Sequence, residues 1–318
     1  MSGMQAAPKR TAPGLLRRAW RSDLAHDFRR SPAAMGAALM LLAFIVSALV
    51  PSLVAPVPVF DLTRINLRDA FVPPAWMEDG SARFLLGTDS QGRDVLSAII
   101  YGARVSMLVG LGSVALALLI GVPLGLIAGY RGGWLDALIM RVADVQLTFP
   151  AILVAVMLDG IARAALGQTV HERNLVPLLI LSIGLTGWVQ YARTVRGATM
   201  VERQRDYVAA AILVGRGSTA VMLRHILPNL WGPIIVSLTF QIPTNIMAES
   251  FLSFIGLGLQ PPFSSWGTLA SEGFRAMKSY PHLIIFPGTV LFLTMLAFNY
   301  LGDGLRDALD PRSRNLLL

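Results

Sequence analysis

The side chains that most often carry out catalysis are sparse in this chain and form no catalytic motif. Cysteine is absent, which excludes a thiolate nucleophile, a disulfide framework and a cysteine-bound metal. Neither lysine, Lys9 or Lys278, follows a glycine, so the Gly-Lys-Ser/Thr loop that binds ATP phosphates is missing. His171 and Glu172 begin a zinc-protease pattern without its second histidine. We therefore expect no enzyme activity, no metal site and no cofactor in this chain.

Polar side chains that could serve transport lie within apolar stretches. Gln241, Asn245 and Glu249 recur at intervals of four, so on a helix they form one stripe. Such a stripe lines an aqueous channel or bonds a neighbouring helix, and we predict that it belongs to a translocation path. Arg141 and Asp144 are three residues apart and are close enough on one helix face to neutralise each other.

The elements that would position these groups are membrane helices. Hydrophobic residues make up 54% of the chain, charged residues only 14%, and the mean hydropathy is +0.59. A soluble domain typically has about 25% charged residues. The net charge of +8 is spread along the edges of apolar stretches and not over a basic patch with interleaved aromatic residues, so nucleic acid is not an expected partner.

Apolar stretches of about 20 residues predict six membrane spans. Lysine and arginine are more numerous on one side, which predicts that both termini are cytoplasmic. The predicted fold is an all-α integral membrane protein with this N-in, C-in topology. Its basic N-terminal tail (1–33) would lie on anionic lipid, the first span and an external segment would follow (34–98), then a permease core (99–303) and a C-terminal tail (304–318). The spans are expected at 34–53, 105–129, 135–158, 175–191, 227–255 and 282–301.

The longest polar interruption of the second half, residues 190–229, is rich in arginine and cannot lie in hydrocarbon. Apolar residues recur there at helical spacing from Tyr207 to Val214, Gly215 interrupts them, and a second short period ends at Pro228. These features predict a helix, a break, a second helix and the start of the next span.

The order Ala209-Ala210-Ala211, Gly215 and Leu227-Pro228 resembles the "EAA" loop of permease subunits of ATP-binding-cassette importers. Ala209 stands at the position that usually carries the family's Glu. Two further stretches resemble the oligopeptide and dipeptide permeases, specifically their C-type partner. One contains Gly87-Thr88-Asp89, Gly92-Arg93-Asp94 and Gly102-Ala103-Arg104, and the other runs from Glu249 to Trp266. The similarity extends over about residues 30 to 315.

This resemblance implies a multi-pass protein of the bacterial inner membrane. Its partners would be a second, homologous permease, two ATP-binding subunits that hold ATP and Mg, and an extracytoplasmic solute-binding protein. The polar loop (192–226) would provide cytoplasmic coupling helices that dock on the ATPase. The residues assigned to coupling are Asp206, Tyr207, Ala209, Ala210, Ala211, Gly215, Arg216, Arg224, His225 and Pro228.

Peptides are the expected solute. The sequence leaves open glutathione, nickel chelates or peptide-nucleotide compounds. A stand-alone secondary transporter is a weaker alternative, since no internal repeat is visible and the amphipathic inner loop would have no task.

Overall fold

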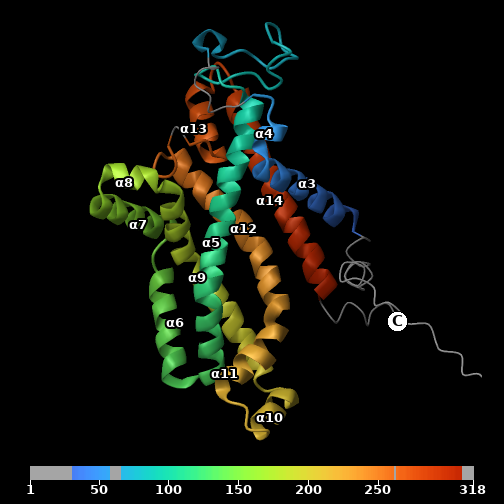
Figure 1. Cartoon of the computed structure of the whole chain (residues 1–318), viewed down its shortest axis with the longest axis vertical. Coiled ribbons are helices and arrows are strands. Elements are labelled where there is room, and N and C mark those ends of the chain that lie inside the picture. Colours follow the sequence, from blue (N-terminus) through green and yellow to red (C-terminus); the bar gives the residue numbers. More distant parts are fainter. Residues whose placement is uncertain (1–30, 58–65, 261–262, 310–318) are drawn as a thin grey trace, which may run out of the picture.

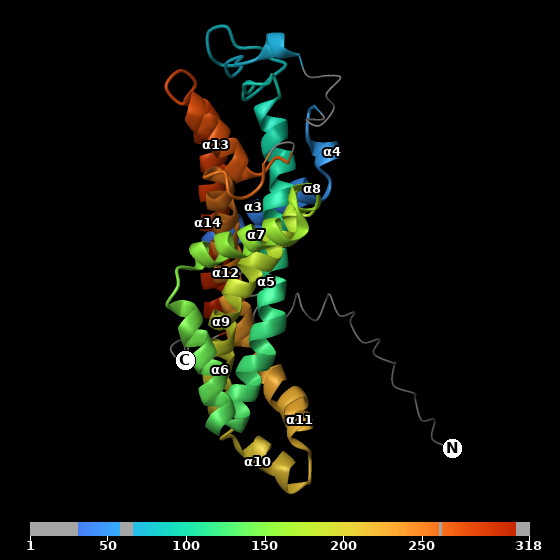
Figure 2. The ribbon, with the colours of Figure 1, turned by 90° about the vertical axis from the view of Figure 1, so that its left-hand side faces the viewer.

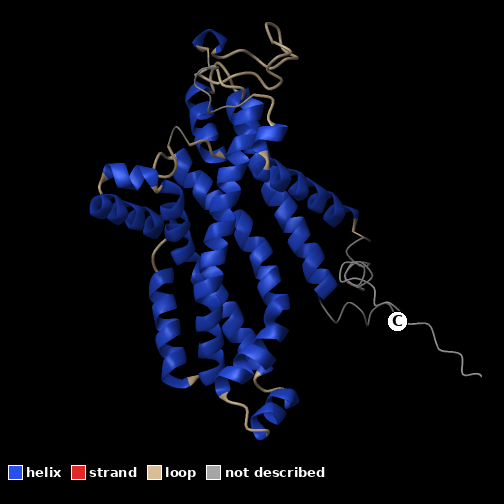
Figure 3. Cartoon of the chain, viewed as in Figure 1, coloured by secondary structure: helices blue, strands red, loops and turns tan. Residues whose placement is uncertain are grey.

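The computed structural model describes residues 31–57, 66–260 and 263–309. Regular structure in these residues is helical (Figure 3), and the only strand-like feature among them is an isolated bridge between Thr88 and Asp94. Five helical stretches of the described chain are long and apolar enough to cross a membrane, and one bent helix pair makes a sixth if it is counted as one span. The predicted all-α membrane fold is therefore confirmed. The five stretches are α3 (Pro32–Leu49), α5 (Val95–Arg131), α9 (Leu175–Glu202), Ser218–Phe254 including α12 (Trp231–Phe254), and α14 (His282–Leu309).

The bent pair replaces the continuous span that we predicted at 135–158. α6 (Gly133–Leu147) and α7 (Ala151–Leu166) meet at 89°. Pro150 is the N-cap residue of α7 and has no amide hydrogen to donate. Its ring also disfavours helical backbone angles at the preceding residue, Phe149. One apolar stretch is thus divided, and α7 and α8 (Gln168–Arg173) lie across the bundle (Figure 1).

The two ends of the bundle carry different segments (Figures 1 and 2). One end carries residues 66–94, with η1 (Leu67–Asp69), and α13 (Trp266–Ala276). The opposite end carries α10 (Asp206–Leu213) and α11 (Ser218–Val221). α3, α6 and α12 run toward the α13 end, whereas α5, α9 and α14 run away from it, which is the alternation expected for N-in, C-in topology. We call the α13 end the outer end and the α10 end the inner end. The remaining short elements are α4 (Pro51–Val54), η2 (Met222–Ile226) and η3 (Leu227–Leu230).

α5 and α9 form the tightest helix pair, and they pack through small residues. Gly121, Gly125 and Gly129 recur every fourth position along α5. A Cβ atom added at these glycines would lie 2.4, 2.4 and 2.7 Å from carbonyl oxygens of α9. Helices in membranes associate through such small-residue faces because close backbone contact replaces the hydrophobic driving force that lipid removes. The short helices of the inner end pack against this pair.

Candidate functional site

The polar segment between α9 and α12 folds into short helices at the inner end (Figure 2). α9 continues to Glu202, so the predicted loop at 192–226 begins inside this helix. α10 stops where Gly215 takes a φ of +81°, which glycine adopts without strain. The amide of Gly215 donates to the Ile212 carbonyl, and the amide of Arg216 donates to the Ala211 carbonyl, a Schellman motif. The predicted helix, glycine break and second helix are confirmed.

One face of α10 is anchored in the bundle. Val208 is fully buried, and Ala211 is 8% exposed. We predicted Ala211 at the coupling surface, but the structure buries it within the chain because a helix that packs on the bundle must turn one face inward. α10 is therefore packed against the membrane helices through this face. The buried cluster around it contains Leu126 of α5, Val195 of α9, and Val221, Met222, Ile226, Leu230 and Ile234.

The other face of α10 and the turn after it are apolar and exposed. Leu213 and Val214 are 88% and 80% exposed, and Ile212 is 50% exposed. The surrounding arginines keep this segment out of hydrocarbon, so these exposed apolar side chains form a candidate protein-binding surface. Our sequence assignment missed Ile212 and Leu213, although the unbroken apolar run from Ala209 to Val214 within a polar segment was the available signal. Four predicted coupling residues are exposed beside them: Asp206, Ala209, Ala210 and Gly215.

Tyr207 ties α10 to both neighbouring helices. Its hydroxyl donates to Glu202 Oε2 at 2.5 Å and accepts a hydrogen bond from Asn229 Nδ2 at 3.0 Å. Partial burial and the adjacent Glu202 raise the pKa of Tyr207, so the phenol keeps its proton. The ring is 38% exposed and borders the apolar surface.

The remaining predicted coupling residues surround this apolar surface. Arg216, Arg224 and Pro228 are exposed, and His225 is half-buried, with its carbonyl accepting a hydrogen bond from Asn229. Among the residues that the structure describes, neither Arg216 nor Arg224 forms an ion pair. These two cations are therefore available to an acidic partner.

The predicted polar stripe on α12 lies inside the subunit. Glu249 is fully buried and accepts hydrogen bonds from the hydroxyls of Ser106 on α5 (3.0 Å) and of Ser253 (2.8 Å) and Ser250 (3.3 Å) on its own helix. Asn245 is 5% exposed, and Gln241 is half-buried. Ser106 also accepts a hydrogen bond from the Trp266 amide at 3.2 Å. Glu249 thus joins α12 to α5 through buried hydroxyl groups, and Ser106 joins α5 to the first residue of α13.

Two ion pairs connect α6 to α9. Arg196 binds Asp136 in bidentate geometry, with distances of 2.5 and 2.6 Å. Arg193 binds Asp144, so the pairing we expected between Arg141 and Asp144 is wrong. An arginine on the neighbouring helix reaches the carboxylate, which Arg141 one turn away on the same helix does not.

The outer end is closed by a polar network. Asp89 accepts hydrogen bonds from the amides of Gln91 and Arg93, and its Oδ2 binds Arg93 Nε at 2.6 Å. Arg93 also binds Glu272 of α13 at 2.7 Å, which connects the external segment to the bundle. Burial raises the pKa of Glu272, and the Arg93 guanidinium partly offsets this effect. Phe71 stacks on Tyr280 at 4.5 Å beside this network.

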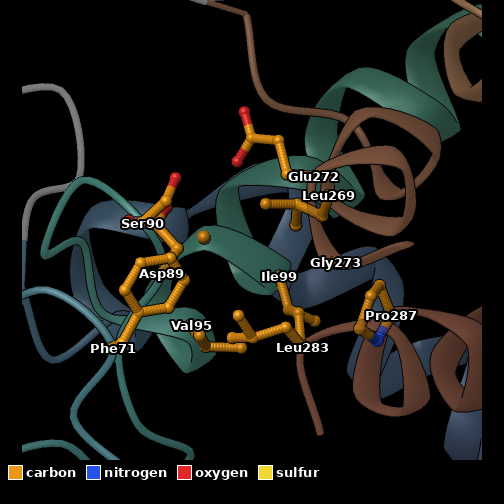
Figure 4. A pocket seen from close by; sticks show the side chains of 11 residues that line it. Phe71, Asp89, Ser90, Val95, Ile99, Leu269, Glu272, Gly273, Leu283 and Pro287 are labelled. Atoms are coloured by element: carbon orange, nitrogen blue, oxygen red, sulfur yellow. The ribbon is translucent and has the colours of Figure 1, made fainter. Parts of the chain in front are cut away.

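A small pocket lies next to this network (Figure 4). Its volume of ≈ 20 Å³ is room for roughly one water molecule, so it cannot hold a transported solute. Within the described residues, no group of three or more His, Cys, Asp or Glu side chains could hold a metal ion. The pocket is lined by Phe71, Asp89, Ser90, Val95, Ala98, Ile99, Leu269, Glu272, Gly273, Leu283 and Pro287.

Comparison with solved structures supports this architecture. A chain of the MetNI methionine ABC transporter, solved in inward-facing conformations, superposes with a TM-score of 0.54 at 15% sequence identity. The match covers 68% of this chain and 97% of that chain. At this identity the likeness concerns the fold.

Sequence comparison covers nearly the whole chain. The di/tripeptide transport system permease protein DppC of Pseudomonas aeruginosa is 38% identical over 97% of this chain and 96% of its own length. The oligopeptide permease protein OppC of Bacillus subtilis is 37% identical, over 90% of this chain and 88% of its own. The glutathione permease protein GsiD of Pectobacterium atrosepticum is 38% identical, over 94% of this chain and 93% of its own.

The family model for binding-protein-dependent transport system inner membrane components matches residues 121–315. This range contains the bent pair, the inner-end helices, α12 and α14. The chain therefore belongs to the family of inner membrane components of binding-protein-dependent transport systems.

Proposed function

We propose that this chain forms half of the translocation pathway of an ATP-driven importer and that the exposed apolar face of α10 docks on an ATP-binding subunit. The observation that carries the proposal is the combination of 88% exposure at Leu213 with full burial at Val208 on the same short helix. A helix buried on one side and apolar on the other transmits movement, because separation from a partner would expose the apolar side to water.

This proposal implies several partner subunits. ATP and Mg belong to two ATP-binding subunits, and a second, homologous permease completes the pathway. A solute-binding protein delivers the solute at the outer end. There, a groove of ≈ 830 Å³ between the external segment and the end of α13 is lined by Phe71, Gln91, Arg275, Lys278 and Tyr280, among others.

The mechanism is mechanical coupling. Closure of the ATP-binding pair moves α10, and the buried cluster around Val208 passes this movement to α5, α9 and α12. The spans then exchange inward-facing and outward-facing states, biased by the different affinities of the two states for nucleotide. Arg216 and Arg224 would meet acidic groups of the ATP-binding subunit and fix its orientation.

The proposed solute is a peptide. The relatives named for dipeptides, oligopeptides and glutathione share the chemistry of a peptide bond between charged ends, and this chain resembles them to a similar degree. Glutathione is therefore the second candidate, and the solute-binding protein, a separate chain, would decide between them.

The test is purification of the tagged chain from its own membranes in mild detergent, followed by mass spectrometry and an ATPase assay. We expect a homologous permease and ATP-binding subunits, and ATPase activity that increases with the matching binding protein and a peptide. A chain recovered alone, even after crosslinking, would contradict the proposal and favour the stand-alone transporter.

A further inference from the structure

The groove at the outer end lies between the external segment and the C-terminal end of α13. Its volume of ≈ 830 Å³ compares with ≈ 20 Å³ for the small pocket beside it. Phe71, Ser90 and Gln91 form the wall on the external segment, and residues between Glu272 and Tyr280 form the wall on α13 and the turn after it. This turn lies at the outer end of the molecule (Figure 2), so the groove opens toward the outer solution.

The unpaired charges of the groove are positive. Arg275 and Lys278 are exposed, and neither forms an ion pair among the residues that the structure describes. Glu272 is the one carboxylate among the lining residues, and it already binds Arg93 at 2.7 Å. Charged groups across an interface are arranged so that opposite signs meet. The groove therefore favours a partner that carries carboxylates.

Apolar side chains lie beside these cations. Phe274 and Met277 line the groove and are 51% and 42% exposed. Aromatic residues, methionine and arginine are enriched at protein interfaces. A small-molecule site buries most of the surface of its ligand, whereas most residues that line this groove are exposed. The groove is therefore suited to another protein and not to a free solute.

The wall on the external segment is preformed. Phe71 has a φ of +60°, a conformation that residues with a side chain rarely adopt. Two contacts hold it: its ring stacks on Tyr280 at 4.5 Å, and its amide donates to the Asp89 carbonyl at 3.1 Å. Residues held in such conformations cluster at binding and switch regions. A surface that is fixed before binding loses less conformational freedom when a partner docks.

We propose that this groove is the docking site of the solute-binding protein and that it receives a segment in which carboxylates flank an exposed apolar side chain. This inference rests on the proposed function, and it adds the place of docking and the charge of the partner. The carboxylates would pair with Arg275 and Lys278, and the apolar side chain would cover Met277. Exposed interfacial charges act mainly on the association rate and are screened by salt, so binding should weaken as salt increases.

The test measures the affinity of the purified solute-binding protein for the complete importer in lipid nanodiscs. The binding protein used is the one that stimulates the ATPase activity of the wild-type importer. R275E and K278E each reverse one charge of the groove. K278E is the second variant because Arg275 also acts on the charge of Glu272. The matched control is R68E, which reverses an exposed arginine of the external segment that does not line the groove.

We expect R275E and K278E each to weaken binding about tenfold, the lower end of what electrostatic steering contributes to association rates. R68E should bind as the wild type does, and all three complexes should keep their ATP-binding subunits. Higher salt should weaken binding of the wild type and change that of the two groove variants little.

Affinities of R275E and K278E equal to that of R68E, with intact complexes, would overturn this inference and leave the proposed function standing. Unchanged affinity with slower peptide transport would assign the groove to the solute and also overturn it. A wild-type complex that lacks ATP-binding subunits would instead refute the proposed function.

The natural absence of cysteine allows a second measurement of the charge of the partner. A photoreactive group on M277C should crosslink to the solute-binding protein within a peptide that contains Asp or Glu, and the same group on R68C should give no such crosslink. A crosslink from M277C to the second permease, or to a peptide without acidic residues, would contradict the assignment.

Discussion

The two ends of this molecule differ in whether their side chains find partners within the chain. At the outer end, Asp89, Arg93 and Glu272 satisfy one another, and Arg93 is only 7% exposed. At the inner end, Leu213 and Val214 are left in water, and Arg216 has no ion-pair partner among the described residues. The charged groups of the outer network are paired within the chain, whereas these apolar and cationic side chains at the inner end have no such partner among the described residues. Changes in the outer network should therefore affect the stability of the chain, and changes at the inner end its coupling.

The largest expected effect is on coupling at the inner end. A210E and L213E place a charge on the exposed apolar face of α10, so stimulated ATPase activity should be abolished. Neither side chain belongs to the buried cluster, so membrane insertion should be unchanged. The measurement compares stimulated ATPase activity with the yield of the chain in membranes. M77E, an exposed change at the outer end, is the control for the effect of an added charge on membrane yield. Normal coupling in L213E would refute the docking assignment.

The next effect is on stability at the outer end. R93A leaves Asp89 without its buried cation, and breaking a buried pair in this way costs about 3 kcal/mol. We expect a clearly lower melting temperature of the detergent-purified chain. R83A, which breaks the exposed Arg83–Asp69 pair at 3.8 Å, should change the melting temperature little. Equal melting temperatures for the two variants would show that the outer network does not hold the fold.

A smaller effect is the pH dependence of the outer network. Because the pKa of Glu272 is raised in the folded chain, the folded state binds this proton more readily than the unfolded state does. Acidification should thus add stability to the folded chain through Glu272. This stability is fully present below pH 4.5, the ordinary pKa of a glutamate, and it is lost as the pH rises through the raised pKa of the folded state. E272Q should lack this increment in melting curves recorded against pH. A wild type and E272Q with parallel pH profiles would contradict the assignment.

The smallest effect is expected at Tyr207. Y207F removes the hydroxyl that joins Glu202 and Asn229, and such hydrogen bonds contribute about 1 kcal/mol. Coupling efficiency, measured as ATP hydrolysed per solute transported, should worsen slightly, and the melting temperature should hardly change. Y207A, which also removes ring contacts, should have the greater effect; the reverse order would show that the hydroxyl is not the important group.

Sequence patterns predicted most of the membrane fold because hydropathy and helix length are local properties. The α6–α7 bend was missed, since Pro150 lies within a stretch whose average hydropathy is that of a span. The pairing of Asp144 was also missed, because it depends on the close approach of α6 and α9, not on spacing within one helix.

The candidate site was predicted in part for a similar reason. Helical spacing identified α10, but which of its faces points inward depends on the cluster formed with α5 and α9, so the burial of Ala211 could not be predicted. The path-lining role predicted for Glu249 stays a prediction, and a buried carboxylate and a channel-facing one look alike in sequence. Only the positions of Ser106 and Ser253 distinguish them.

The most direct test of the docking claim is site-specific crosslinking at the inner end in native membranes. A photoreactive group is attached to L213C, the only cysteine of such a variant, and to A211C as the buried control. We predict that the group at position 213 crosslinks to an ATP-binding subunit and that the group at 211 crosslinks within the chain or not at all. A complex that contains the ATP-binding subunits but gives no crosslink to them from position 213 would contradict the claim.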